Sequence, residues 1–176
     1  MESILGADAY TDHMDIEEFL QEHGIAFQRF DHPAVFTCEE SQRLVPPMPS
    51  MHTKNLFLRD DKWKRFFLVS VGHDKNVDLK QLKKILGVQK LSFGSPERLQ
   101  EMLGVTPGAV TLLGLIHDHD HRVEVIIDAA LWEADALGCH PLVNTATLVI
   151  AKEDIEKFLA VTGHRAKIIE VPEREL

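Results

Sequence analysis

The chain has 176 residues, of which 44% are hydrophobic and 27% charged, and its formal net charge is −9. These are ordinary values for a globular protein with its own core, and we expect one domain over residues 1–176. No apolar run approaches the roughly 20 residues that cross a bilayer. The N-terminus lacks the features of a signal peptide, and two cysteines are too few for a disulfide framework. We therefore expect a cytoplasmic protein that does not associate with membranes.

Positive charge gathers in one part of this acidic chain. Residues 51–95 hold ten Lys or Arg and four Asp or Glu, a local charge of +6. Such a segment can bind an anion while the acidic remainder discourages indiscriminate contact with nucleic acid. The alternative is a solvated, lysine-rich helix surface.

Capping and breaker residues divide the first part of the chain. Asp15 is a typical N-cap for a short amphipathic helix that ends at Gly24, and residues 25–30 alternate as a strand does. A capping box at residues 37–40 predicts a brief helix, and the prolines of residues 45–49 predict a stiff loop.

The middle of the chain predicts a β-hairpin followed by two helices. The apolar residues 56–58 and 66–71 flank a charged tip, which is the pattern of two paired strands. Residues 79–86 and 96–103 carry apolar side chains at helical spacing, and each run is closed by a glycine.

The last third predicts further strands and a helix. We expect residues 110–116 and 123–127 to pair as strands, residues 154–159 to form a helix, and residues 167–171 to form the last strand. Strands and helices are interspersed without strict βαβ alternation, so the predicted fold is α+β, with a mixed sheet and helices packed outside it.

Three alternating histidines, His117, His119 and His121, lie between two of these predicted strands. In an extended chain they would share a face and could hold zinc. A hairpin tip is the more common setting for such a polar run, and it lacks the supporting residues of a metal centre. We interpret the run as a surface turn and predict no metal.

Cys139 and His140 are adjacent, which suggests a thiol–imidazole pair. Consecutive residues of an extended chain point to opposite faces, so the two side chains should diverge. We therefore interpret Cys139 as a small packing residue.

Residues 104–110 contain a Pro-Gly turn that leads into an apolar run. Pro107 presets φ and Gly108 tolerates positive φ, which predicts a type II turn with exposed N–H groups that could hold an oxygen. The glycine-rich nucleotide motifs are absent from the sequence, so we expect no cofactor.

Residues 138–147 combine a glycine, a histidine, a proline and an asparagine just before an apolar run. Gly138 frees the backbone and Pro141 removes a hydrogen-bond donor, so this stretch should be an irregular, open strand. Such a backbone suits close approach by a ligand, although a structural histidine in a turn is the alternative.

Taken together, residues 53–56, 103–110 and 138–147 resemble the YbaK/prolyl-tRNA synthetase-associated domain family in order and spacing. The similarity runs over nearly the whole chain and is strongest to the free-standing ProXp-ala (PrdX) branch. It implies a mixed, partly barrel-like sheet flanked by helices, and hydrolysis of mischarged Ala-tRNA(Pro). Its implied partners are the acceptor end of tRNA(Pro) and prolyl-tRNA synthetase.

The resemblance also assigns site residues. The family's functional lysine, turn glycine and histidine fall on Lys54, Gly108 and His140. Many relatives carry serine where this chain has Ala109. The residues that we expect to surround the substrate are Thr53, Asn55, Ala109, Val110, Gly138, Leu142 and Asn144. Lys80, Lys83 and Lys84, on or beside one predicted helix, are candidates to bind phosphates of the acceptor stem.

Two other functions remain open at this point. The protein could instead deacylate Cys-tRNA(Pro), as another member of the same family. A basic segment with Lys54 would serve equally well in a tRNA- or DNA-binding module without catalysis.

Overall fold

The computed structural model describes residues 15–34 and 50–175. The helix expected at residues 37–40 and the loop expected at residues 45–49 lie outside the described residues. In the part that is described, no helix is both long and apolar enough to cross a membrane.

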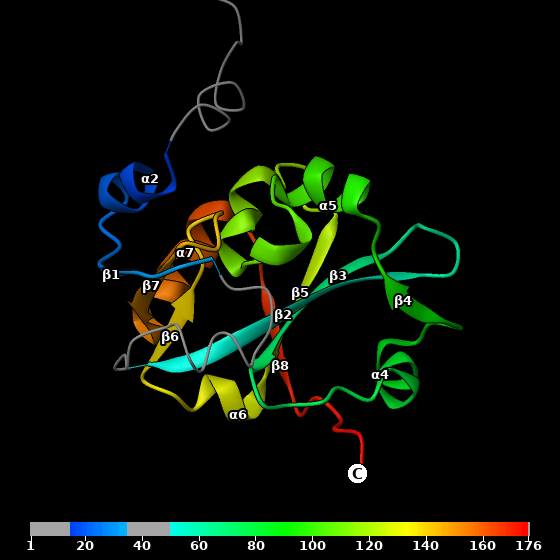
Figure 1. Cartoon of the computed structure of the whole chain (residues 1–176). Coiled ribbons are helices and arrows are strands. Elements are labelled where there is room, and N and C mark those ends of the chain that lie inside the picture. The colour runs from blue at the N-terminus through cyan, green and yellow to red at the C-terminus, as the bar shows by residue number, and fades with distance from the viewer. Residues whose placement is uncertain (1–14, 35–49, 176) are drawn as a thin grey trace, which may run out of the picture.

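Helices and strands alternate irregularly along the chain (Figure 1). The helices are α2 (Ile16–Glu22), α4 (Leu79–Leu86), α5 (Pro96–Leu103), α6 (Ala129–Trp132) and α7 (Lys152–Thr162), with 3₁₀-helices η1 (Pro107–Ala109) and η2 (Leu112–His117). The strands are β1 (Gln28–Asp31), β2 (Met51–Asp60), β3 (Phe66–Gly72), β4 (Leu91–Phe93), β5 (Val123–Asp128), β6 (Ala136–Cys139), β7 (Ala146–Ala151) and β8 (Ala166–Ile169).

The strands form one mixed sheet. Their order is β1-β7-β6-β2-β3-β5-β8, and β4 pairs with β2 outside this path. The pairs β2–β6, β3–β5 and β5–β8 are parallel, and the other pairs are antiparallel. The predicted α+β class with a mixed sheet flanked by helices is confirmed.

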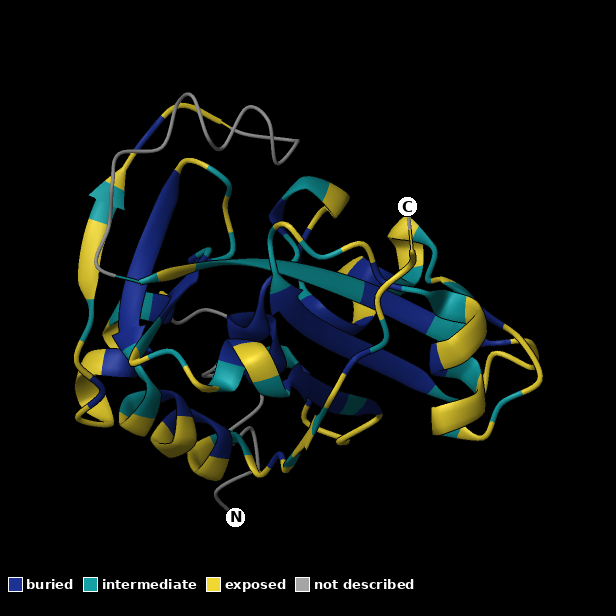
Figure 2. Ribbon diagram, turned by 90° about the horizontal axis from the view of Figure 1, so that it is seen from below, coloured by how far each residue is buried: buried dark blue, intermediate teal, exposed yellow. Residues whose placement is uncertain are grey.

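Strand β3 is buried on both faces, which divides the interior into two cores. Phe66 and Leu68 join the first core, with the apolar sides of α2, α5, η2 and α7. Phe67 and Val69 point the other way, into a second core that includes Leu82 of α4. Figure 2 shows these central strands buried and the outer sides of the helices exposed. The near-continuous apolar sequence of β3 follows from this two-sided burial.

Three of the predicted helices begin with a side-chain cap. The Asp15 carboxylate accepts from the Glu17 N–H at 2.8 Å, and Asp78 accepts from the first N–H groups of α4. Ser95 accepts from the Arg98 N–H at the start of α5. These bonds satisfy helix donors that have no intrahelical partner.

The predicted strand at residues 110–116 is wrong, because most of this segment is the 3₁₀-helix η2. A short apolar run does not distinguish a buried strand from a buried helical turn. Two local features accompany the helical conformation. The Thr111 hydroxyl accepts from the Leu113 N–H, and Gly114 lies so close to α5 that a Cβ there would be 3.0 Å from the Leu103 carbonyl oxygen. The segment therefore packs against α5 as a tight helix.

The expected strand at residues 123–127 is confirmed as β5, but its partners differ from the prediction. It pairs in parallel with β3 and β8, so residues 117–121 do not form a hairpin tip. Smaller shifts occur at both ends of the chain, where β1 begins three residues late and β8 ends at Ile169.

Two of the three alternating histidines cover helix ends. The ring of His117 lies over Gly104, at the end of α5. The ring of His121 lies over Gly163 after α7, and its Nε2 is 2.8 Å from the Thr162 carbonyl oxygen. These side chains thus diverge toward different helices.

Asp118, in the same turn, is buried and holds three elements together. Its carboxylate accepts from His164 Nε2 at 2.9 Å and from the backbone N–H groups of Arg122 and Val123. Burial alone would raise the pKa of Asp118, but these hydrogen bonds prevail and lower it below its ordinary value.

We predict that Asp118→Ala destabilises the fold by about 3–5 kcal/mol, because it leaves His164 and two N–H groups buried without an acceptor. Urea denaturation at neutral pH measures this loss. Asp120→Ala, an exposed neighbour, is the control and should change the free energy of unfolding by less than about 0.5 kcal/mol. Equal effects of the two changes would contradict a structural role for Asp118.

Candidate active site

Strand β2 changes its partner along its length. Its first residues, Met51 and His52, pair with β6, whereas residues 58–60 pair with β4. Between these two strands, no other described strand lines the edge of residues 53–56, and only β3 flanks them on the opposite edge. We call residues 53–56 the β2 notch. Figure 1 shows β6 and β4 at opposite ends of the long β2 strand.

On the side of the first core, the β2 notch is tied to the two other motifs of the sequence. Thr53 Oγ1 donates to the Gly138 carbonyl at 2.6 Å. Asn55 Nδ2 donates to the Val110 carbonyl at 3.4 Å, and Asn55 Oδ1 accepts from the Ser70 hydroxyl. The structure therefore brings Thr53, Asn55, Val110 and Gly138 together around the notch.

Gly138 leaves room for this close approach. A Cβ at this position would lie 3.1 Å from Thr147 Cγ2 and 3.4 Å from Ser50 Oγ. A side chain at this position would require Thr147 and Ser50 to shift by a few tenths of an ångström.

Lys54 faces the other way from Thr53 and Asn55, because successive side chains of a strand alternate. His52 shares its face, and His52 is the register partner of Gly138 on β6. His140 follows two residues after Gly138 and therefore extends along the same face. The Lys54 ammonium donates to the carbonyl of Lys75, a residue in the loop that follows β3.

His140 is half-buried and held in one tautomer. Its Nδ1 lies 3.1 Å from the Ala146 carbonyl oxygen, which can only accept, so Nδ1 carries the proton and Nε2 keeps its lone pair. Burial lowers the pKa of His140 below 6.5; the bond to Ala146 opposes this shift, and the charge of His32 adds to it. His140 is therefore a neutral base at physiological pH.

Further histidines lie on this face that the sequence did not single out. The rings of His32 and His140 are 6.3 Å apart, and Nε2 of buried His32 is hydrogen-bonded to the Thr147 hydroxyl at 2.8 Å. His52 lies 5.4 Å from His73, and burial, together with the charge of His73, lowers the pKa of His52. A histidine before a proline, as His32 is, is a weak signal in the sequence; only the fold brings these rings together.

The Pro-Gly segment differs from its prediction. Residues 107–109 form the 3₁₀-helix η1, and Gly108 does not have a positive φ, so the predicted type II turn is wrong. The Ala109 N–H is used by the Thr106 carbonyl at 2.9 Å, and the Ala109 side chain is buried. This hydrogen bond does not involve the N–H of Gly108.

The loop between β6 and β7 carries the remaining predicted site residues. Leu142 has a φ of 66°, an uncommon value for a branched side chain, and it packs with Val110 against the first core. Asn144, two residues further on, is half-buried in the same loop. Leu142 and Val110 are both half-buried against the same core.

The three predicted tRNA-binding lysines lie on α4. Lys80 and Lys84 are exposed and four residues apart, so they share one side of the helix. Lys83 and Lys84 lie in the last turn, where positive charge also favours the helix dipole.

Cys139 is buried in the first core, and burial raises its pKa to about 12. It is therefore a thiol rather than a thiolate nucleophile, and the prediction of a packing role is confirmed. Within residues 15–34 and 50–175, no three His, Cys, Asp or Glu side chains are grouped to hold a metal ion.

A neutral imidazole and an ammonium group on one face of an open strand edge suit hydrolysis of an activated bond in an anionic substrate. The fold and the site thus define a hydrolase-type α+β domain. The chain matches the model of the aminoacyl-tRNA editing domain over residues 32–158 and belongs to that family. It is accordingly a hydrolytic aminoacyl-tRNA deacylase, and the resemblance seen in the sequence is confirmed.

Similar proteins cover most of the chain. It is 38% identical over 152 residues to the "Prolyl-tRNA editing protein ProX" of Acetoanaerobium sticklandii, covering 86% of this chain and 93% of that one. It is also 38% identical over 157 residues to "Prolyl-tRNA synthetase associated domain-containing protein 1" of Danio rerio, covering 88% and 85%. A crystal structure described as a candidate trans-editing enzyme for prolyl tRNA synthetase shares the fold with a TM-score of 0.66 at 19% identity, covering 97% and 99%.

We predict that deacylation depends on neutral His140. Because its pKa lies below 6.5, log kcat/KM should stay flat from about pH 8 down to 6.5 and fall only as the pH drops through that lowered pKa. The measurement is a pH–rate profile corrected for spontaneous ester hydrolysis.

His140→Asn should abolish this acid limb and reduce kcat/KM by about 10²- to 10⁴-fold, the usual contribution of a general base. His52→Asn, on the same face, should retain the limb and serves as the control. An inflection above pH 6.5 in the parent protein would contradict the assignment to His140.

Proposed function

We propose that the protein is a trans-acting editing hydrolase that deacylates mischarged Ala-tRNA(Pro). The proposal is carried by the register of β2 and β6, from which strand alternation puts Lys54 and neutral His140 on the same face of the sheet. The names of its relatives, a prolyl-tRNA editing protein and a prolyl-tRNA synthetase associated domain protein, support tRNA(Pro) as the carrier.

The proposed reaction needs little covalent chemistry from the protein, because an aminoacyl ester is already activated. His140 Nε2 takes a proton from a water molecule, or orients it through a hydroxyl of the terminal adenosine. The water oxygen attacks the ester carbonyl carbon, the ester C–O bond breaks, and the ribose oxygen leaves as a hydroxyl after taking up the proton. Alanine and free tRNA are the products.

Two further groups complete the proposed site. The Gly108 N–H, beyond Val110 on the other side of the notch, is the candidate donor to the developing oxyanion. Lys54 binds a phosphate of the unpaired 3′ end of the tRNA. Access along the open edge of β2 lets groups on both faces of this strand reach one substrate.

The remaining contacts extend the proposal outward. Lys80, Lys83 and Lys84 of α4 contact phosphates of the acceptor stem. Prolyl-tRNA synthetase is the proposed partner, because it produces the mischarged tRNA, and the cytoplasm is the proposed location.

A panel of Ala-, Cys- and Pro-tRNA(Pro) given to purified protein tests the function, and faster hydrolysis of Cys-tRNA(Pro) than of Ala-tRNA(Pro) would contradict the alanine assignment.

We predict that Lys54→Ala lowers kcat/KM by about 10- to 150-fold, because a hydrogen bond to a charged group contributes about 1.5–3 kcal/mol. The fold should persist, which thermal unfolding checks. Lys157→Ala is a matched control, since the Lys157 ammonium also donates to a backbone carbonyl, that of Gly24 at 3.0 Å, but on α7. Unchanged turnover in folded Lys54→Ala protein would remove Lys54 from the mechanism.

We also predict selectivity by size. Val110 and Leu142 are the proposed walls of a pocket that admits alanine and excludes the prolyl ring, since a tightly packed site resists added atoms. Ala-tRNA(Pro) should be hydrolysed much faster than Pro-tRNA(Pro) in single-turnover assays.

The wall residues test this sieve directly. Val110→Ala or Leu142→Ala should narrow the difference between the two substrates by admitting proline. Val161→Ala, at an exposed position on α7, is the control and should leave the ratio unchanged. Comparable hydrolysis of both substrates by the parent protein would show that no sieve exists.

A further inference from the structure

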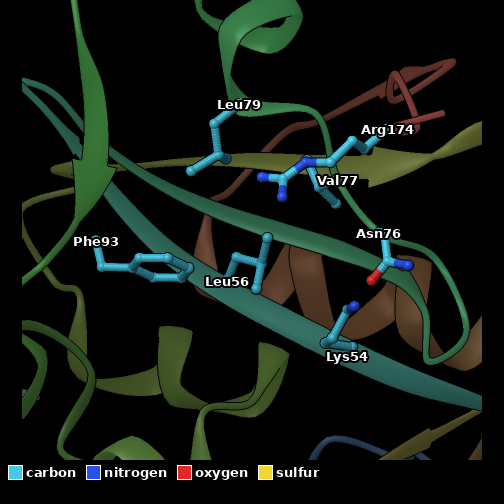
Figure 3. A pocket seen from close by; sticks show the side chains of 7 residues that line it. All are labelled: Lys54, Leu56, Asn76, Val77, Leu79, Phe93 and Arg174. Atoms are coloured by element: carbon cyan, nitrogen blue, oxygen red, sulfur yellow. The ribbon is translucent and has the colours of Figure 1, made fainter. Parts of the chain in front are cut away.

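A hollow of about 190 Å³ opens on the Lys54 face of the β2 notch (Figure 3). It lies between β2, β4, the start of α4 and the C-terminal segment that follows β8. Its lining residues include Lys54, Leu56, Asn76, Leu79, Phe93 and Arg174. Apart from Lys54 and Leu56, none of these residues belongs to the sequence motifs described above.

The hollow has an apolar wall with an exposed aromatic ring. Phe93, the last residue of β4, is 60% exposed, and its register partner is Leu58 of β2. It therefore stands on the same face as Leu56, beside which Figure 3 shows its ring. An exposed phenylalanine next to aliphatic side chains offers a flat surface on which a planar ring can stack.

Positive charge reaches the same hollow from two sides. Arg174 comes from the C-terminal segment, where its N–H donates to the Asn76 carbonyl at 2.7 Å and the Pro172 carbonyl accepts from the Asp78 N–H at 2.9 Å. Figure 3 shows Arg174 on one side of the hollow and Lys54 on the other, beside the amide of Asn76. These two backbone bonds fix the segment that carries the guanidinium.

The charge continues beyond the hollow. Arg174 and Lys80 both line an adjoining hollow of about 540 Å³. The one acid in this second lining, Asp78, already accepts from two N–H groups of α4. Glu173 bridges Val77, and alternation turns its side chain away from that of Arg174. The residues that line the two hollows therefore carry a net positive charge.

We propose that this hollow binds an unpaired nucleotide of RNA, with the base stacked on Phe93 and its phosphates held by Arg174 and Lys54. Stacking on an aromatic ring beside cationic groups is how single-stranded nucleic acid is bound without sequence readout. The inference rests on the proposed function, because Lys54 joins the hollow to the reaction centre. A nucleotide in the hollow is then the neighbour of the aminoacylated adenosine in the β2 notch.

The test uses two fluorescein-labelled RNA hairpins, one with an unpaired 3′ tail of four nucleotides and one with a blunt end, and measures affinity by anisotropy. Phe93→Ala should weaken binding of the tailed hairpin by about 5- to 150-fold, the range for loss of one base–aromatic stack, and leave the blunt hairpin unchanged. Phe93→Trp should retain tight binding. Arg174→Ala should reduce the slope of log affinity against log salt by about 0.7.

Two matched variants serve as controls for the change of residue type. Trp63→Ala removes another exposed aromatic at the β2–β3 hairpin, and Arg165→Ala removes another exposed arginine. Both should bind the tailed hairpin as the parent protein does. Equal binding by Phe93→Ala and the parent, or equal weakening on tailed and blunt hairpins, would overturn the proposal.

Deacylation assays on the same proteins separate this inference from the proposed function. If the parent protein deacylates its substrate and Phe93→Ala changes neither the affinity for the tailed hairpin nor the KM, the nucleotide site is refuted and the proposed function stands. A parent without deacylase activity that still binds the tail through Phe93 supports the hollow and refutes the hydrolase.

Discussion

Strand β2 is shared between two parts of the sheet, and the site depends on how its edge is divided. One end pairs with β6 and the other with β4, which leaves the edge of the β2 notch between them. Backbone polar groups at a strand edge need partners. Neighbouring groups supply some of them: the Gly94 N–H donates to the Phe57 carbonyl of β2, and the Thr53 hydroxyl donates to the Gly138 carbonyl of β6. Residues 53–56 are left without a described strand partner along this edge.

The two cores on either side of the sheet fix the directions of the side chains at this opening. Phe57 is anchored in the first core and Leu58 in the second, so the alternation of β2 cannot slip by one residue without exposing both. Lys54 is thereby held on one face and Asn55 on the other. Burial of His140 lowers the pKa of its imidazole, so packing of the sheet also keeps this side chain neutral. Packing and chemistry are thus coupled through one strand.

The distribution of charge complements this arrangement. The chain is acidic as a whole, yet its basic residues gather between residues 51 and 95. The fold adds Arg174 from the opposite end of the chain to this region. A local positive surface in a negative protein attracts a polyanion in one orientation and repels it elsewhere. This favours presentation of a nucleic-acid end to the β2 notch over binding along the whole surface.

The sequence by itself determined the capped helices, the β2–β3 hairpin, the mixed α+β class and the three segments that meet at the site. These features rest on local signals, such as the Asp78 cap and the glycine after α4, which act over a few residues. Only the tertiary structure decided that residues 112–117 coil into η2 and that His32, Phe93 and Arg174 adjoin the site. The reason is physical: a short buried run is equally apolar in a strand or a helix, and contacts between residues far apart in the chain leave no periodic pattern in it.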